Sequence, residues 1–434
     1  MGVRVAGLVL VAASLVACGG GSDGSDAHEP TTLAVPADYD TVQAAVDAAR
    51  SGDTVLVSPG TYNEAVRVDT AGVRLQGTDR SDVVFDGDGL KGNGITVTAA
   101  DVVVANLTVQ NFNQNGVLVT GFTKDGGIGH GSDGYETLDP EAFPPIEGFA
   151  VRYVTASNNG LYGIYAFDSH DGVLEHNYAS GHPDSGIYVG QCQECRILVR
   201  DNVLERNAVG YEQANASDSV VVTGNRLVGN RVGLTVLSDY QEAFVPTTDG
   251  TVVGNLVADN NEVDTPHQAE GGFGIGIGLS GAVGTTVERN LVTGNETAGI
   301  AISSSADLPP TGNELSGNTA TGNGADIWYA ASTLAPGSGN CLADNTVTST
   351  RPPGLAADLT CADGSAGAGD QGAGVELTMA RDPQGIAFFD VVAPPAQPSM
   401  PAADADLGPG FVEVDLDQVP LPAAGLLADL AAVR

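Results

Sequence analysis

Lysine is nearly absent from this chain, because Lys91 and Lys124 are the only two among 434 residues. The 17 basic residues are outnumbered by 54 acidic ones, which gives a formal net charge of −37. This imbalance excludes nucleic acid as a partner, since phosphates need a basic surface. It also disfavours polyanionic ligands unless divalent cations bridge carboxylates on both sides. Such a charge does help to keep a protein soluble outside the cytoplasm.

Long hydrophobic runs are missing as well. The apolar run of residues 5–16 is too short to span a membrane, and it ends in LVAC, with Cys18 last. This ending resembles a bacterial lipobox, which implies that Cys18 is acylated and becomes the mature N-terminus. We therefore predict a lipoprotein signal peptide over residues 1–17 and a flexible tether over 18–32. The protein would then be extracytoplasmic and held at the bacterial cell membrane by its lipid anchor only.

Cysteine is scarce, with five residues, of which one is the predicted lipidation site. The other four (Cys192, Cys195, Cys341 and Cys361) are an even number in an oxidising compartment, so we expect two disulfides. Sequence alone leaves the connectivity open, and proximity favours Cys192–Cys195 and Cys341–Cys361. A redox CxxC is disfavoured because no βαβ pattern surrounds it, and zinc would need two more ligands nearby.

The first structured segment predicts a cap. In residues 41–50 (TVQAAVDAAR) apolar side chains recur with the spacing of one helical face, and Gly52 is placed to end the helix. A strand over 54–57 and the run PGTYNE at 59–64 follow. This opening resembles the start of many parallel β-helix proteins, in which a short helix plugs the open end of the coil. It is also similar to pectin methylesterases, but their catalytic aspartate motifs are missing downstream.

The strongest pattern is a repeat of 22 to 25 residues. Pairs of asparagines five residues apart recur in it, at Asn106/Asn111, Asn202/Asn207, Asn225/Asn230, Asn255/Asn260, Asn290/Asn295 and Asn318/Asn323. Stacked coils need such a period, and turn asparagines at one height can bond the backbone above and below. We predict an all-β fold, a single-stranded right-handed parallel β-helix over 33–350, with about ten coils between Tyr62 and Val347.

Two insertions interrupt the repeat, at 121–148 and 238–273. Loops of this length in a solenoid usually rise from one face and wall a groove. Beyond residue 350 the repeat stops, so 351–434 is expected to be a C-terminal extension that is partly extended or disordered.

Aligned coils place polar side chains in outward columns. These columns hold Tyr165, Tyr188 and Glu212 on the strand, and Asp168, Gln191 and Asn215 at the following turn. A solvated sheet face is the common explanation of such residues, and a ligand-binding ledge is the alternative.

The segment YAFDSHD, from Tyr165 to Asp171, carries the most specific motif. It resembles the YGFDPH(D/E) motif of mannuronan (alginate) carbon-5 epimerases, which are right-handed parallel β-helix proteins. The resemblance implies that His170 and Tyr165 are the proton-transfer pair on opposite faces of the sugar. It also implies that Asp168 orients the histidine or shares a proton with the uronate carboxylate. The second histidine and the arginine of that family have no counterpart, since the corresponding positions 208–211 read AVGY.

The chemistry implied by this resemblance is proton abstraction beside a uronate carboxylate of an acidic polysaccharide. It requires a base of near-neutral pKa and neutralisation of the developing charge. Return of the proton from the other face gives an epimerase, and loss of the neighbouring sugar oxygen gives a lyase. We expect Tyr165, Asp168 and His170 to be catalytic. The expected substrate-binding residues are Asp171, Tyr188, Gln191, Glu212, Asn215 and Lys124, the last from the first insertion.

Two other functional classes stay open. One is a non-catalytic surface lipoprotein that binds glycan or another cell-envelope component, or that resembles the NosD-like β-helix accessory proteins of periplasmic copper delivery. The other is a structural or adhesive stalk. In every case we expect a monomer.

The histidines do not predict a metal centre. His182 lies five residues after Asn177, so it is expected to replace a turn asparagine, and His176 is expected at the surface. His170, His176 and His182 lack the spacing of metal ligands, and we predict no metal site. Calcium held by surface carboxylates is the one cofactor left open.

Overall fold

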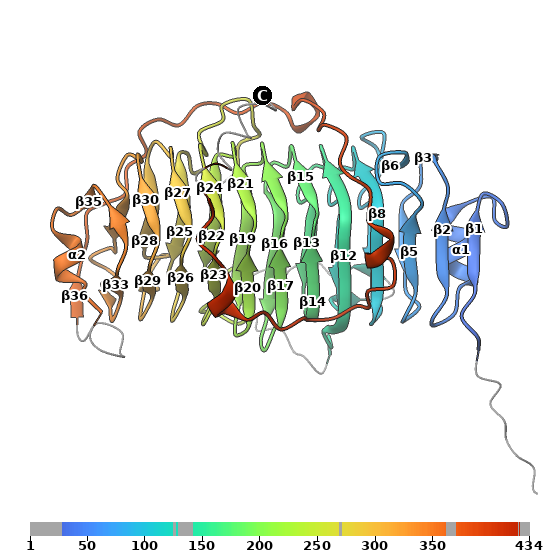
Figure 1. Cartoon of the computed structure of the whole chain (residues 1–434), viewed down its shortest axis with the longest axis horizontal. Coiled ribbons are helices and arrows are strands. Elements are labelled where there is room, and N and C mark those ends of the chain that lie inside the picture. Colours follow the sequence, from blue (N-terminus) through green and yellow to red (C-terminus); the bar gives the residue numbers. More distant parts are fainter. Residues whose placement is uncertain are drawn as a thin grey trace, which may run out of the picture.

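The structure is a computed structural model that describes residues 28–124, 127–128, 142–268, 271–361, 370–423 and 425. Within them the chain coils into a right-handed parallel β-helix of about 12 turns with very few helices (Figure 1). The predicted fold class is therefore confirmed. The predicted signal peptide, Cys18 and the tether up to residue 27 lie outside the described residues.

Each turn contributes strands to three faces. Face 1 holds β1 (Thr32–Val35), β2 (Thr54–Val57), β5 (Arg74–Gly77), β8 (Val102–Gln110), β12 (Ile146–Ser157), β14 (Ser169–Glu175), β17 (Ile197–Arg200), β20 (Val220–Thr223), β23 (Thr251–Val253), β26 (Thr286–Glu288), β29 (Glu314–Ser316) and β33 (Cys341–Ala343). Face 2 holds β3 (Gly60–Tyr62), β6 (Val83–Asp86), β15 (Tyr178–Ser180), β18 (Val203–Glu205), β21 (Arg226–Val228), β24 (Leu256–Ala258), β27 (Leu291–Thr293), β30 (Thr319–Thr321) and β34 (Thr346–Val347), and the long strands β8 and β12 continue into it.

Face 3 is a separate sheet of parallel strands. It holds β4 (Val66–Val68), β7 (Ile95–Val97), β9 (Val117–Thr120), β13 (Ile164–Phe167), β16 (Ser185–Cys192), β19 (Val209–Ala216), β22 (Val232–Leu237), β25 (Ile275–Ser280), β28 (Ala298–Ser303), β31 (Ile327–Ala330) and β35 (Thr350–Arg351). The elements outside the three faces are β10 (Thr123–Lys124), β11 (Gly127–Ile128), β32 (Gly337–Ser338), β36 (Asp370–Gly372), α1 (Val42–Ala48), α2 (Leu355–Asp358) and the 3-10 turns η1 (Phe388–Asp390), η2 (Ala402–Asp404) and η3 (Leu416–Gln418).

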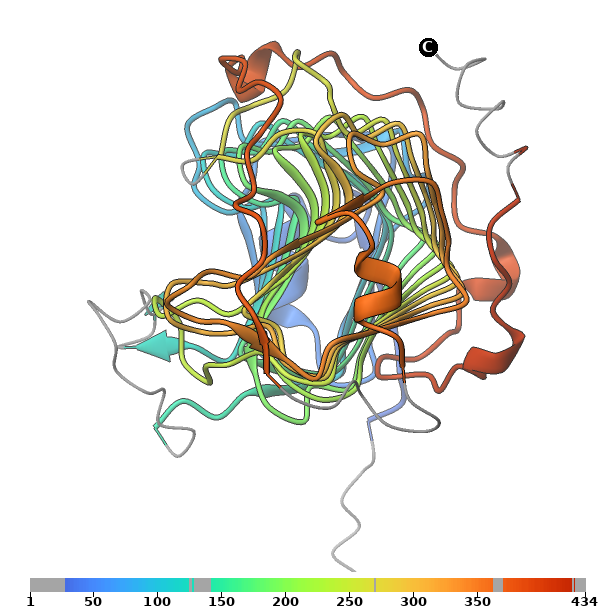
Figure 2. The same ribbon diagram turned by 90° about the vertical axis from the view of Figure 1, so that its left-hand side faces the viewer.

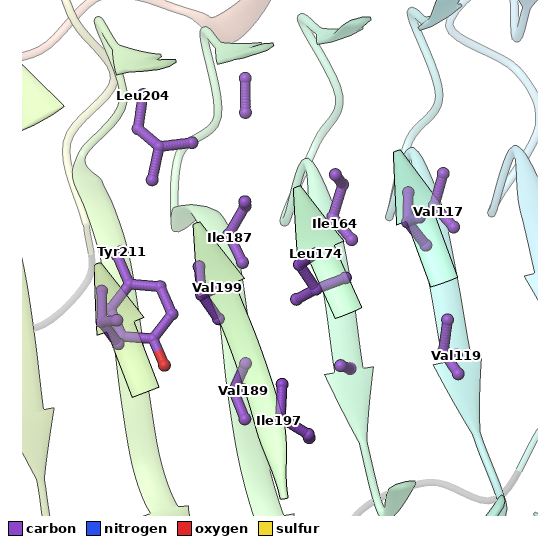
Figure 3. Close-up of a cluster of buried hydrophobic side chains, with 14 of the residues drawn as sticks. Val117, Val119, Ile164, Leu174, Ile187, Val189, Ile197, Val199, Leu204 and Tyr211 are labelled. Carbon is purple, nitrogen blue, oxygen red and sulfur yellow. The ribbon is translucent and has the colours of Figure 1, made fainter. Parts of the chain in front are cut away.

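Apolar side chains fill the inside of the coil, turn upon turn. Parallel strands repeat each position about 4.8 Å above the last, so inward positions must be apolar on every turn. Ile164, Ile187, Tyr211 and Leu234 are fully buried and paired in this order by the strand register, as predicted. Figure 3 shows Ile164, Ile187 and Tyr211 pointing into this core.

A ladder of asparagines, buried except at its last member, runs through successive turns. It comprises Asn177, Asn202, Asn225, Asn255, Asn290, Asn318 and Asn345. In each step the backbone N–H of one asparagine donates to the side-chain Oδ1 of the next, at 2.9–3.0 Å. The side-chain Nδ2 in turn donates to a strand carbonyl of the preceding turn, such as Asn255 to Val222 at 2.9 Å. Each ladder residue therefore satisfies buried backbone groups that the corner of the coil would leave unpaired.

A second ladder lies five residues further along each turn. It comprises Asn207, Asn230, Asn260, Asn295 and Asn323. His182 takes the place of an asparagine in it, because its backbone N–H and its ring Nδ1 both lie within hydrogen-bond distance of Asn207 Oδ1, at 3.2 and 2.8 Å, and Asn159 Nδ2 lies 3.2 Å from its Nε2. His182 is fully buried, and burial lowers its pKa to about 4, so the ring is neutral. The prediction that it replaces a turn asparagine is confirmed.

The first predicted asparagine pair does not belong to these ladders. Asn106 and Asn111 have φ of 57° and 59°, in the left-handed region. Val154, whose N–H bonds the ladder residue Asn177, is in register with Leu107, so Asn106 falls one residue too early. The interval of five recurs here because asparagine also tolerates positive φ at a tight corner.

The helix at the start closes one end of the coil, as Figure 1 shows. The α1 helix begins after Thr41, whose side chain accepts a hydrogen bond from Ala44 N at 3.2 Å. Its buried residues Val42, Ala45 and Val46 continue the core.

A C-terminal segment, residues 370–423, runs back along the outside of the coil, and we call it the strap (Figures 1 and 2). Its backbone carbonyls accept hydrogen bonds from Arg74, Arg80, Arg152, Arg231 and Arg289, which project from the coil. Its apolar side chains Met400, Phe411, Val414 and Leu416 pack on buried outer residues of face 1. The strap is thus an integral part of the fold.

Two disulfides occur in the described chain, and both predicted pairings are confirmed. Cys192–Cys195 closes the turn after β16, with a Cα–Cα distance of 5.4 Å. Cys341–Cys361 ties β33 to the segment after α2, with a Cα–Cα distance of 4.7 Å. Both distances suit disulfide geometry.

Candidate functional site

Tyrosine rings gather on the outer side of face 3. Tyr165 in β13 and Tyr188 in β16 are register partners, and Tyr162 lies just before β13. The ring centroids of Tyr162 and Tyr165 are 4.4 Å apart, and Tyr188 lies 4.9–5.0 Å from both. Tyr188 is buried, whereas Tyr162 and Tyr165 are partly exposed. These three rings, the tyrosine cluster, form an aromatic surface on the outside of the coil.

Side chains from both insertions pack against this cluster. Phe122 and Phe143 come from the first insertion, and their ring centroids are 4.7 Å apart. Ala243 and Phe244 come from the second, and all four pack into one apolar group with the tyrosines and Phe167 in β13. The second insertion forms two separate loops, 238–250 and 259–274, because β23 and β24 interrupt it.

A pair of carboxyl groups lies beside the tyrosine cluster. Glu212 in β19 is the register partner of Tyr188, and Asp184 lies just before β16. The two carboxyl groups interact with each other electrostatically, and Tyr162 lies beside Asp184. Ser185 Oγ donates to Glu212 at 2.5 Å and to Asp184 at 3.3 Å. Gln268 Nε2, from the 259–274 loop, lies 3.0 Å from Asp184 Oδ1 and 3.5 Å from Glu212 Oε2.

Burial raises the pKa of Asp184. Burial together with the nearby Asp184 charge raises the pKa of Glu212 well above its usual range. Both carboxyl groups reach the same Ser185 Oγ, so two negative charges there would repel each other, and this favours a proton on the pair.

A third carboxyl group reaches the cluster from the 238–250 loop. Tyr188 Oη donates a hydrogen bond to Glu242 Oε1. Burial raises the pKa of Glu242 to about 8. Its other oxygen, Oε2, is buried and has no hydrogen-bond partner in the described part of the structure.

Asp168 lies at the corner between β13 and β14, with φ of 53°. Its side chain is 2% exposed, and burial raises its pKa to about 7. Its Oδ2 has no hydrogen-bond partner among the described residues. A methyl group added at Gly121, where the first insertion begins, would lie 3.0 Å from this oxygen, so Asp168 sits directly under that loop.

The structure places His170 in a different environment from Tyr165. His170 lies in β14 on face 1, as the register partner of Glu147. Asp171, Glu147 and Glu194 are the charged groups that act on it, while burial lowers its pKa. Asp171 itself pairs with Arg196 at 3.1 Å. The described contacts join Tyr165 to the tyrosine cluster and none joins it to His170, because the corner at Asp168 turns the chain between them.

Gln191 and Asn215 hold the 238–250 loop in place. Gln191 Oε1 accepts a hydrogen bond from Ala243 N at 3.0 Å. Asn215 Nδ2 donates to the Asp239 carbonyl at 2.6 Å, and Asn215 Oδ1 accepts from Asp239 N at 2.9 Å. Their side-chain groups are thus engaged in positioning Glu242 and the rest of this loop.

Cations lie elsewhere in the described chain. Arg152 and Arg200 both pair with Glu175, at 2.9 and 2.7 Å, on face 1. The side chain of Lys124 and the whole of His130 lie outside the described residues. His176 stacks on Tyr153, with ring centroids 4.8 Å apart. No group of three His, Cys, Asp or Glu residues in the described chain is arranged to hold a metal ion.

Four site residues were missed from the sequence: Tyr162, Asp184, Glu242 and Gln268. Glu242 and Gln268 belong to the second insertion, whose path no repeat dictates. Asp184 had one available signal, because it follows the ladder residue His182 by two positions and so had to lie at the entry to face 3.

None of the described helices is both long and apolar enough to cross a membrane.

Two family models match the chain. Residues 72–247 match the model of the right-handed beta helix region. Residues 243–351 match the model of the periplasmic copper-binding protein (NosD). No curated protein matches the sequence.

Similar solved structures include two modules from Azotobacter vinelandii. The A-module of mannuronan C-5 epimerase AlgE4 is 17% identical, with 71% of this chain and 91% of that chain covered and a TM-score of 0.41. The A-module of the AlgE6 epimerase is 15% identical, with 71% and 93% covered and a TM-score of 0.46. Pectate lyase Pel9A is 14% identical, with 89% and 93% covered and a TM-score of 0.45.

Proposed function

We propose that this protein is an extracytoplasmic β-helix protein that binds and processes a glycan on the outer side of face 3. The observation that carries the proposal is the tyrosine cluster with the carboxyl groups of Asp184 and Glu212, which share Ser185 Oγ, at its edge. Both insertions meet there, as the walls of a binding site in a solenoid do.

The tyrosine cluster suits sugar rings. Aromatic rings offer apolar area with a polar tip, and ligand sites combine such surfaces with a few placed polar groups. Tyr162 and Tyr165 are partly exposed, and the polar groups beside them are Asp184, Glu242 and Gln268. This combination matches a ligand that has apolar ring faces and many hydroxyl groups.

The carboxyl groups suit acid–base chemistry. A catalytic acid or base works best when its pKa lies near the operating pH. Burial raises the pKa of Asp168 to about 7 and that of Glu242 to about 8. Cleavage of a glycosidic bond by protonation of the leaving oxygen uses a carboxyl group of this kind.

Proton abstraction from a uronate, by an epimerase or lyase acting through Tyr165, Asp168 and His170, stays a prediction. That reaction needs a cation to neutralise the carboxylate. Arg152 and Arg200 are bound to Glu175 on face 1, so they do not supply it. Among the described side chains, which do not include that of Lys124, the geometry favours acid catalysis or binding over proton abstraction.

Copper binding finds little support in the residues of the matched segment 243–351. Copper in accessory proteins is held by Cys, Met or His. This segment contains His267 and Cys341 but no methionine, and Cys341 is in a disulfide. His267 lies 3.3 Å from Asp382 of the strap.

An extracytoplasmic location is supported by the two disulfides and by the match to a periplasmic family model. Lipid anchoring at Cys18 is part of the proposal and rests on the sequence alone. Radioactive palmitate should label the wild-type protein in a bacterial host, and Cys18→Ser should abolish the label.

A glycan panel tests the proposed function. The purified chain is screened by isothermal titration against oligosaccharides, and each ligand that binds is tested for cleavage by chromatography. Tyr165→Ala should weaken binding at least tenfold, because it removes one ring of the cluster. Phe389→Ala is the matched control, since that ring is 49% exposed on the strap and should leave binding unchanged. Failure of a folded protein to bind any glycan would refute the proposal.

A further inference from the structure

We propose that the face 3 site selects an uncharged glycan, and that the Asp184–Glu212 pair hydrogen-bonds its hydroxyl groups as a proton-sharing unit. This inference rests on the proposed function and specifies the class of its ligand.

The first argument is the neutrality of every group that contacts the pair. Its hydrogen-bond partners are Ser185 Oγ and Gln268 Nε2, both uncharged donors, and the uncharged Tyr162 lies beside Asp184. Carboxyl groups that form ion pairs contact Arg or Lys side chains. No Arg or Lys contacts Asp184 or Glu212 among the described residues. Neutral donors match a ligand that brings hydroxyl groups rather than charge.

The second argument is the charge of the surrounding chain. Residues 121–148 contain six acidic residues and one lysine, Lys124, and residues 238–273 contain seven acidic residues and neither lysine nor arginine. Phe122 and Phe143 of the first segment and Ala243 and Phe244 of the second contact the tyrosine cluster. A uronate polymer would bring a carboxylate on every residue close to Asp184, Glu212 and Glu242, and like charges at close range disfavour binding.

The third argument is the presence of unpartnered oxygens near the cluster. Asp168 is 2% exposed, and its Oδ2 has no partner in the described part of the chain. Glu242 Oε2 is likewise buried and without a partner there. A buried polar atom without a partner is costly, and such atoms mark sites that a ligand completes. Sugar hydroxyl groups can donate to both oxygens.

The protonation state of the pair predicts how glycan affinity changes with pH. The groups that act on the pair are Glu242 and the hydroxyls of Tyr162, Tyr165, Tyr188 and Tyr211. The raised pKa of Glu212 keeps the shared proton in place at neutral pH. As pH rises, the pair loses its proton and with it one hydrogen-bond donor. The two adjacent carboxylates would then lose favourable hydration when a bound ligand buries them. Glycan affinity should therefore be lower at alkaline pH, and the ionisation of Glu242, whose pKa burial raises to about 8, acts in the same direction.

The experiment compares uncharged hexose oligosaccharides with uronate oligosaccharides of equal length, by isothermal titration at pH 6 and pH 9. The wild-type chain should bind the uncharged ligand and lose at least tenfold in affinity at pH 9. Glu212→Gln keeps the shape of the side chain and removes its proton equilibrium, so its loss between the two pH values should be smaller. Asp184→Asn is the second variant should Glu212→Gln fail to fold, and Glu376→Gln, an exposed carboxyl on the strap, is the control.

The outcomes separate the two proposals. Equal or tighter binding of uronates, or an affinity for the uncharged ligand that does not fall at pH 9, would overturn this inference and leave glycan binding intact. Absence of binding to both ligand classes would refute the proposed function itself.

Discussion

We expect the asparagine ladder to contribute strongly to the stability of the fold, and Asn255→Ala tests this prediction. Asn255 lies in the middle of the ladder and is fully buried. Its Oδ1 accepts from Asn225 N at 3.0 Å, and its Nδ2 donates to the Val222 carbonyl at 2.9 Å and to Asn290 Oδ1 at 3.0 Å. Alanine removes all of these partners at once and admits no water in their place.

The size of the expected loss of stability follows from the backbone groups that lose their hydrogen-bond partner. A buried donor or acceptor left without a partner costs about 1–3 kcal/mol. The Asn225 N–H and the Val222 carbonyl each lose their side-chain partner, so the substitution should lower the free energy of unfolding by about 4 kcal/mol. Asn345→Ala is the matched control, because Asn345 ends the ladder and is partly exposed, so water can replace it. Its cost should be about 1 kcal/mol.

Equilibrium unfolding in urea measures both variants. The midpoint should fall much further for Asn255→Ala than for Asn345→Ala, with the slope unchanged. If the two substitutions cost the same, or if Asn255→Ala costs less than about 1 kcal/mol, the ladder does not satisfy buried backbone groups as argued.

Two further predictions concern stability. The folded pKa of Glu242 is about 8 against an ordinary value of 4.5, so the folded state binds more protons between these values and stability should fall as pH rises through this window. The ceiling is about 5 kcal/mol at 1.36 kcal/mol per pKa unit, and urea titrations at several pH values should show that Glu242→Gln flattens the slope; an unchanged slope would contradict the assignment. Replacing Cys341 and Cys361 by serine should cost about 3 kcal/mol, and replacing Cys192 and Cys195 about 2 kcal/mol, because the first pair closes a longer loop of sequence separation 20 against 3. Thermal unfolding of the two double variants checks this order, and the reverse order would refute it.

Local periodicity explains why most of the fold was predictable. The inward column of Ile164, Ile187 and Tyr211 and the outward pair of Tyr165 and Tyr188 follow from a repeat that the register reproduces. Each turn must present the same side chain type at the same height, so the pattern is written into every unit. The asparagine pair Asn106/Asn111 was misplaced because asparagine serves two roles at a corner, as a ladder residue and at positive φ.

The site was less predictable, because half of it comes from segments outside the repeat. Glu212 was placed correctly beside Tyr188 by its column, but Glu242 reaches Tyr188 from a loop 54 residues away in sequence. The positions of the cations were unpredictable for the same reason. Arg152, for example, donates to the Leu407 carbonyl of the strap, 255 residues away. No periodic pattern in the sequence predicts such contacts.

The course of the strap gives a physical reason for the position of the site. On face 1 it packs on outward residues from Val103 to Val221 and draws in Arg152, so this face is covered along its middle turns. On face 3, Trp328 Nε1 donates to the Val375 carbonyl at 2.8 Å, and Leu377 packs on an outer cluster that includes Val209, Val232 and Trp328. The tyrosine cluster on β13 and β16 belongs instead to an apolar group that contains residues of both insertions and none of the strap. A ligand that binds along the coil would find aromatic and acidic groups at this cluster.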